Sequence, residues 1–232
     1  MRFFQLLFIT ILFSTCISCQ DSQTKEKKLS DEHNISVIKK EKKPTKPARP
    51  TKVSNENCVS FLTEYGKNNP EHIVRLKTKF GSMEIELFDD TPLHRANFIH
   101  IVKRGFLDET CFYRVDKGFV IQGGNSDKFS MAKIKNRIGI FTIPHEFKKN
   151  LKHNYGTVAM ARIYKKNPEK RSSPFEFYID MDPKGSSHLD QEHTIIGRVI
   201  KGMDVAKKIN VLETDKSEWP IDDVYMTATV VK

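Results

Sequence analysis

Residues 112–124, FYRVDKGFVIQGG, constrain the fold more than any other stretch of the chain. Their Phe, Val and Ile residues favour buried β-structure, while Lys117-Gly118 and Gly123-Gly124 are typical of turns. We therefore predict a strand, a tight turn and a second strand. Arg114 falls in the middle of the first strand, with no acidic residue evident opposite it. A lone arginine in such a place usually points outward, so a buried role needs further support.

Alternating runs elsewhere predict a chain built mainly from short strands. Residues 73–87 alternate apolar and polar side chains around a central turn, which predicts a β-hairpin, and residues 224–230 alternate in the same way. Apolar residues at helical spacing predict two helices, one from Pro92 to about residue 104 and one over residues 203–209. Many short strands with two helices favour a closed antiparallel barrel with the helices over its ends.

The motifs together resemble the cyclophilin family of peptidyl-prolyl cis/trans isomerases, in which Phe-His-Arg-Val leads through a Gly-Phe turn to Ile-Gln-Gly-Gly. Tyr113 stands where that family usually has His. The resemblance runs from about Ile73 to the C-terminus and implies a mainly β fold, an eight-stranded antiparallel barrel capped by two α-helices. Further matching segments are TPLHRANF (91–98), GTVAMA (156–161), FEFYI (175–179), HLD (188–190) and HTIIGRV (193–199).

The resemblance also implies a site. Rotation about an X-Pro bond is opposed by roughly 18–20 kcal/mol, and a guanidinium aimed at the imide nitrogen stabilises the twisted bond more than the planar one. By resemblance, Arg114 is this donor, Gln122 binds substrate backbone and helps to hold Arg114, and Phe119 belongs to the proline pocket. Strand alternation puts Phe119 and Gln122 on opposite faces, so a shared site requires a bulge, which we expect near Gly123. The implied substrate-binding residues are Val120, Ala161, Arg162, Glu176, Tyr178, His188, Leu189 and His193.

Several of these residues depart from the family pattern. Tyr178 adds a hydroxyl where Phe is usual, and this hydroxyl must find a partner or reach water. Arg162 and Glu176 replace uncharged residues along the groove, and they either pair with each other or select charged peptides. His188 stands where many members carry the Trp that contacts cyclosporin-type inhibitors, so we expect weak cyclosporin binding. The basic residues 162–174 predict a lip beside the groove.

The N-terminus predicts export. Residues 1–18 have a basic start and an apolar run too short to span a bilayer comfortably, which is typical of a secretory signal. Ser18-Cys19 resembles a bacterial lipoprotein signal, in which Cys19 becomes the lipidated first residue. Cys16 occupies the position where Leu is usual, and a plain secretory signal with incidental cysteines is the alternative. We therefore expect a protein that is lipid-anchored in the bacterial cell envelope and acts on exported, proline-containing polypeptides.

Residues 19–57 are predicted to form a basic, disordered tether. Residues 25–52 hold ten Lys or Arg against four Asp or Glu, and they contain no aromatic residue. Such a segment lacks the apolar surface that offsets chain entropy. Its charge of +6, out of +10 for the whole chain, either attracts anionic lipid head groups or keeps a soluble spacer extended. Nucleic acid is not an expected partner of an exported chain.

Residues 58–72 are predicted to be a short helical lead-in, and residues 73–232 a single isomerase domain. Cys58 and Cys111 are expected to be free thiols, although an oxidising compartment permits a disulfide. The sequence has no Cys/His spacing typical of zinc and no phosphate loop, so we expect no metal or other cofactor. We also expect the protein to be a monomer. Two alternatives stay open: a non-catalytic proline-peptide binding module or holdase on the same scaffold, and a small-ligand carrier, which needs an open barrel interior.

Overall fold

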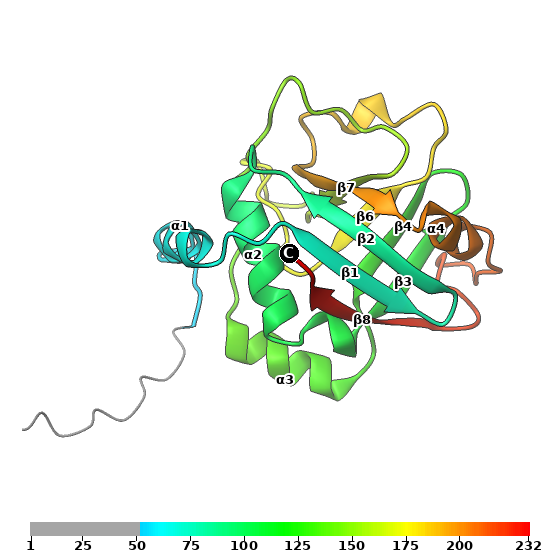
Figure 1. The fold of residues 1–232 in the computed structure, drawn as a ribbon, viewed down its shortest axis with the longest axis horizontal. Helices are drawn as coiled ribbons and strands as arrows, with labels where there is room; N and C mark the ends of the chain where they lie inside the picture. The colour runs from blue at the N-terminus through cyan, green and yellow to red at the C-terminus, as the bar shows by residue number, and fades with distance from the viewer. Residues whose placement is uncertain (1–51) are drawn as a thin grey trace, which may run out of the picture. The chain divides into compact units, whose positions relative to one another are not determined.

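In the computed structural model, which describes residues 52–232, eight antiparallel strands close into a barrel (Figure 1). The order around the barrel is β1-β2-β7-β5-β6-β4-β3-β8, and β8 pairs with β1 to close it. The predicted eight-stranded antiparallel barrel is confirmed. The strands are β1 (Ile73–Thr78), β2 (Gly81–Leu87), β3 (Cys111–Asp116), β4 (Val120–Asn125), β5 (Thr157–Met160), β6 (Phe177–Asp180), β7 (Ile195–Lys201) and β8 (Val224–Val230).

The two predicted helices lie at opposite ends of this barrel (Figure 1). They are α2 (Pro92–Lys103), which has Thr91 as its N-cap and Pro92 in its first turn, and α4 (Met203–Asn210). The predicted lead-in forms α1 (Cys58–Asn68). A fourth helix, α3 (Phe129–Ile138), was not predicted, because half of its residues are polar and only two of the ten are buried. Short 3₁₀ turns cover Leu107–Glu109 and Ser187–Leu189.

The barrel interior is filled with apolar side chains. Residues from all eight strands are completely shielded from solvent, and rings from β3, β6 and α2 meet edge to face within this core. A core packed to this degree excludes the open interior that a ligand carrier would need. The shielded strand residues include Leu76, Met83, Ile85, Phe112, Ile121 and Phe177.

Ordered packing begins before the predicted lead-in. Val53 is buried, forms a parallel bridge with Gly139, and donates its N–H to the carbonyl of Ile138 at 2.8 Å. Gly139 has φ +134°, and a Cβ there would lie 1.9 Å from the Val53 carbonyl oxygen. Only glycine permits this approach. The segment around Val53, predicted to belong to the tether, is therefore part of the folded unit.

Helix α1 is attached to the barrel through α2. Leu62 is fully buried, and the rings of Phe61 and Tyr65 pack 5.1 and 4.9 Å from the ring of His100 in α2. Cys58 and Cys111 are buried free thiols, as expected. Among residues 52–232, no helix combines the length and apolar character that crossing a bilayer requires. The predicted signal over residues 1–18, the lipidation site at Cys19 and the predicted tether as far as residue 51 lie outside the described residues.

Candidate active site

A β-bulge in β3 organises the site. Phe112 pairs with Gly123 and Arg114 pairs with Gln122, so Tyr113 is the extra residue. A bulge was expected near Gly123, and the pairing is irregular on both strands there: Tyr113 is the extra residue on β3, and Gly124 is skipped on β4 between Gly123 and Asn125. The bulge changes the facing of the following residues, so that side chains from both strands and from the intervening turn reach one cavity.

Gly123 and Gly124 do not form a turn, contrary to the prediction, because both lie within β4. A Cβ on Gly123 would come within 2.8 Å of the Met226 side chain, and a Cβ on Gly124, which has φ +95°, would lie 2.1 Å from the Phe175 carbonyl oxygen. The pair therefore allows close packing of the strand, which is a second common use of glycine in a sheet.

The cavity has a volume of about 130 Å³ and is formed by β3, β4, β6 and the segments that follow β5 and precede β7. Every predicted site residue except Glu176 and His188 lines it, and Tyr164 is an additional wall residue that the sequence did not predict. The lining residues are Arg114, Phe119, Val120, Gln122, Ala161, Arg162, Tyr164, Tyr178, Leu189 and His193.

The floor of the cavity is apolar. Val120 and Tyr178 belong to a small buried cluster against which Phe119 and Leu189 pack. The Tyr178 hydroxyl lies 2.9 Å from His153 Nε2, and His153 Nδ1 lies 3.0 Å from an Asp190 carboxylate oxygen.

The protonation of this Tyr-His-Asp chain follows from burial, which raises the pKa of Tyr178 and lowers the pKa of His153. The phenol therefore keeps its proton and donates to a neutral imidazole, which in turn donates to Asp190. The hydroxyl is satisfied within the protein, and the ring of Tyr178 presents an apolar surface to the cavity.

Arg114 is held by two carboxylates. Its Nε donates to Glu218 at 2.5 Å and its Nη2 donates to Asp116 at 3.1 Å. Gln122 was expected to help hold Arg114, but its amide nitrogen donates to the Tyr113 hydroxyl instead. The expectation that no acidic residue lies opposite Arg114 is wrong, because Glu218, which is distant in the chain, pairs with it.

Of the two alternatives for Arg162 and Glu176, pairing with each other does not occur. Arg162 pairs with Glu192 at 2.7 Å, and its side chain is only 6% exposed. Glu176 lies beside Tyr113, and burial raises the pKa of its carboxyl. His188 stacks on Phe119 with ring centroids 5.5 Å apart. His188 thus contacts the lining residue Phe119, whereas the Glu176 carboxyl lies beside Tyr113, which does not line the cavity; both residues lie outside the cavity itself.

Comparison with known families decides the identity of the fold. Residues 73–231 match the family described as cyclophilin type peptidyl-prolyl cis-trans isomerase/CLD. The chain belongs to the cyclophilin-type isomerases. It is therefore a peptidyl-prolyl cis-trans isomerase, an enzyme that accelerates rotation of the bond preceding proline.

Relatives of this cyclophilin occur in plants and bacteria. A peptidyl-prolyl cis-trans isomerase of Arabidopsis thaliana is 32% identical over 160 residues, which cover 68% of this chain and 92% of the relative. One of Acinetobacter baylyi is 36% identical over 139 residues, covering 59% and 71% of the two chains. A crystal structure of a Cryptosporidium parvum cyclophilin type isomerase, determined in the presence of the dipeptide Ala-Pro, superposes with a TM-score of 0.56 at 25% identity, covering 69% of this chain and 99% of that one.

The cyclophilin site contains no metal-ligand arrangement. Within residues 52–232, no group of three or more His, Cys, Asp or Glu side chains is arranged to hold a metal ion. The polar groups that the structure brings to the cavity are two guanidinium groups, a primary amide, phenols and a neutral imidazole. These groups can bind and polarise an amide, which is the chemistry that rotation about an X-Pro bond requires.

Proposed function

We propose that this cyclophilin accelerates X-Pro rotation by donating a hydrogen bond from Arg114 to the imide nitrogen. The proposal rests on one observation: the Arg114 guanidinium lies at the cavity wall, and only some of its N–H donors are used in ion pairs. A guanidinium has five N–H donors, and two of those of Arg114 are engaged by Glu218 and Asp116, which leaves three available. Arg162, the other arginine at the cavity, is shielded and committed to Glu192.

The donor acts on the transition state. In the planar amide the imide nitrogen shares its lone pair with the carbonyl, so it accepts hydrogen bonds poorly. Twisting the bond localises the lone pair on nitrogen, and the hydrogen bond from Arg114 strengthens as the barrier is approached. A guanidinium suits this task because it stays charged at any physiological pH.

The remaining lining residues supply binding. The apolar floor formed by Phe119, Val120, Tyr178 and Leu189 accepts the proline ring. The nitrogen of the Gln122 side chain donates to Tyr113, and in this proposal the amide oxygen of Gln122 accepts an N–H from the bound peptide. Gln122 is thus a substrate-binding residue in this proposal, and the orientation of Arg114 depends on the two carboxylates.

The test is catalysed cis/trans exchange of an Ala-Pro peptide, measured by NMR exchange spectroscopy. We expect Arg114→Ala to lower kcat/KM roughly 100-fold or more, in the range found for loss of one transition-state donor. Arg198→Ala is the matched control, because Arg198 is an exposed arginine paired with Glu86 on the barrel surface. An Arg114→Ala variant that keeps wild-type exchange would refute the role of Arg114.

A non-catalytic binding module is the second candidate, and one observation favours it. The ion pairs of Arg114 with Glu218 and Asp116 compete with donation to substrate. A wild-type protein that shifts the NMR signals of the peptide without accelerating its exchange would establish this alternative.

We further propose that the enzyme acts as a monomer on exported, proline-containing polypeptides in the bacterial cell envelope, anchored by lipid on Cys19. Support comes from the order of a basic start, a short apolar run and Ser18-Cys19 in the sequence. Metabolic labelling with a fatty acid, followed by membrane fractionation, tests the anchor. Cys19→Ser should abolish label and membrane recovery while Cys16→Ser should retain both. Equal labelling of the wild type and Cys19→Ser would refute it, and analytical ultracentrifugation tests the monomer.

A further inference from the structure

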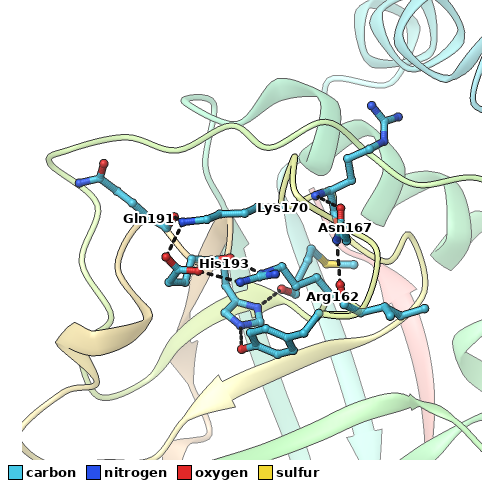
Figure 2. Close-up of polar contacts among 10 residues, drawn as sticks. Arg162, Asn167, Lys170, Gln191 and His193 are labelled. Atoms are coloured by element: carbon cyan, nitrogen blue, oxygen red, sulfur yellow. Dashed lines mark hydrogen bonds and ion pairs between the residues drawn. The ribbon is translucent and has the colours of Figure 1, made fainter.

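Tyr164 reaches the proline cavity from outside the barrel sheet. It lies in the basic segment 162–173 that follows β5, and its ring contributes to the cavity wall although the residue is 64% exposed. Its hydroxyl lies 2.7 Å from Nε2 of His193, a lining residue on the opposite segment. The hydrogen bonds of His193 and of the neighbouring residues are drawn in Figure 2.

The donor in this contact can be assigned. His193 Nδ1 lies 3.1 Å from the Met160 carbonyl oxygen, which can only accept, so Nδ1 carries a hydrogen. Burial lowers the pKa of His193 to about 4, which keeps the imidazole neutral at physiological pH. Nε2 is then an acceptor, and the Tyr164 hydroxyl donates to it. The hydroxyl oxygen of Tyr164 therefore retains only lone pairs with which to bind another group.

A cluster of charges fixes the segment that carries Tyr164. One Glu192 carboxylate oxygen accepts from Arg162 Nη2 at 2.7 Å, the other accepts from Lys170 Nζ, and the Glu192 carbonyl accepts from Arg162 Nε at 2.8 Å. Arg162 and Lys170 thus bind both ends of the segment to the turn at Gln191 (Figure 2). The Arg162 guanidinium also lies 4.1 Å from the centre of the Tyr164 ring, a favourable cation–π distance.

Asn167 closes the same segment from within. Its side-chain nitrogen donates to the carbonyls of Ile163 and Arg171 at 2.9 and 2.8 Å, and its side-chain oxygen accepts from the Arg171 N–H at 2.9 Å. Lys166 and Lys170 both adopt positive φ, which costs free energy for residues with a side chain. The segment thus has one defined conformation, and it presents the phenol of Tyr164 to the cavity.

We propose that Tyr164 is a substrate-binding residue that sets the affinity of this site. Its ring forms the outer wall of the proline pocket, and its hydroxyl oxygen accepts an N–H from the bound chain next to the proline. Glu192 is a positioning residue, because it acts through Arg162 and Lys170 and not on the substrate. The inference rests on the proposed function of the cavity as the proline site.

The test compares Tyr164→Phe, which keeps the wall and removes the hydroxyl, both as acceptor and as donor to His193, with Tyr164→Ala, which removes the wall as well. With an Ala-Pro peptide, we expect Tyr164→Phe to raise KM about three- to tenfold, the loss typical of one neutral hydrogen bond, with little change in kcat. We expect a larger rise in KM for Tyr164→Ala. Tyr225→Phe is the control, because the Tyr225 hydroxyl contacts Asp127 on a different part of the surface.

Glu192→Gln separates positioning from general stability. It should raise KM in the wild-type background and add little in the Tyr164→Ala background, whereas a merely structural role would add the same loss in both. Wild-type KM in both Tyr164 variants overturns the inference and leaves the proposed function intact. A wild-type protein that neither binds nor isomerises the peptide overturns both.

Discussion

Glu218 follows Arg114 by 104 residues in the chain, yet its carboxylate accepts a hydrogen bond from Arg114 Nε over 2.5 Å. Two features bring it there. Glu218 adopts φ +66°, and its carbonyl accepts the N–H of Val115 at 2.8 Å, which fastens the loop before β8 to the edge of β3. Trp219 extends the same contact, with its ring 5.7 Å from that of Tyr113. The guanidinium proposed to act on substrate is therefore oriented by a distant loop.

Removing the ion pair between Glu218 and Arg114 should reduce catalysis. We expect Glu218→Gln to lower kcat about three- to tenfold, which corresponds to roughly 1 kcal/mol for a partly exposed charged pair, because Arg114 then samples more orientations. Glu213→Gln is the control, since Glu213 is exposed on the same loop. NMR exchange with an Ala-Pro peptide measures the effect. Faster exchange in Glu218→Gln would mean that the ion pair competes with donation to substrate.

The hydroxyl of Tyr178 should contribute to stability more than to catalysis. Tyr178→Phe leaves His153 Nε2 buried without its partner, so we expect the free energy of unfolding to fall by about 1–2 kcal/mol, as measured by urea denaturation. Tyr155→Phe is the matched control, because the Tyr155 hydroxyl is buried and has no hydrogen-bond partner among residues 52–232. An equal loss in both variants would contradict the assignment.

Stability should decline in mild acid because of His100. Burial against α1 lowers its pKa from 6.5 to about 4, so between these values the unfolded chain binds a proton that the native protein does not. The contribution of His100 to the free energy of unfolding then falls by about 1.4 kcal/mol per pH unit as the pH drops from 6.5 to 4.

Urea titrations at several pH values, comparing the wild type with His100→Leu, isolate this contribution. His153 and His193 shift in the same direction, so the wild-type slope exceeds that of one group, and the difference between the two proteins reports His100 alone. Parallel slopes in the two proteins would show that His100 titrates normally.

Cyclosporin should bind weakly. His188 stacks on Phe119 where many family members present a Trp, and an imidazole offers less apolar surface than an indole. We expect His188→Trp to tighten inhibition at least tenfold, about 1.4 kcal/mol, in an inhibition titration. Lys184→Trp, on the same connection, controls for an added Trp elsewhere. Tight, stoichiometric inhibition of the wild type would refute the expectation.

The barrel and most of the cavity could be predicted because they depend on short-range patterns. Strand alternation identifies the hairpin of β1 and β2, and Arg114, Phe119 and Gln122 are close in space because they share one hairpin. The family resemblance then supplied the residues that converge on this hairpin from β6 and from the segments beside β5 and β7. Alternation alone would have placed Phe119 and Gln122 on opposite faces, but Phe119 lies in the turn before β4, where strand alternation does not apply. The bulge at Tyr113 has no distinctive residue pattern either.

The charge pairings could not be predicted, because they depend on where loops fold back. Glu176 and Glu192 are both within thirty residues of Arg162, and only the path of segment 162–173 decides between them. That path includes two lysines with positive φ, a conformation that is uncommon for lysine and that the sequence therefore does not predict. Tyr164 was missed for the same reason. Helix α3 was missed because its lysines obscure the spacing of its buried residues.

The bridge between Val53 and Gly139 gives this protein a defined response to mechanical load. A pull on the chain from its N-terminal side would first load the hydrogen bond from Val53 to Ile138 and the two that Asn55 accepts from Thr142, and would then peel α1 away from α2. Strand β1 comes next, but it is paired along both edges, with β2 and with β8, and would be loaded in shear across many bonds at once. The elements before β1 would therefore lengthen under tension while the barrel and its pocket keep their shape.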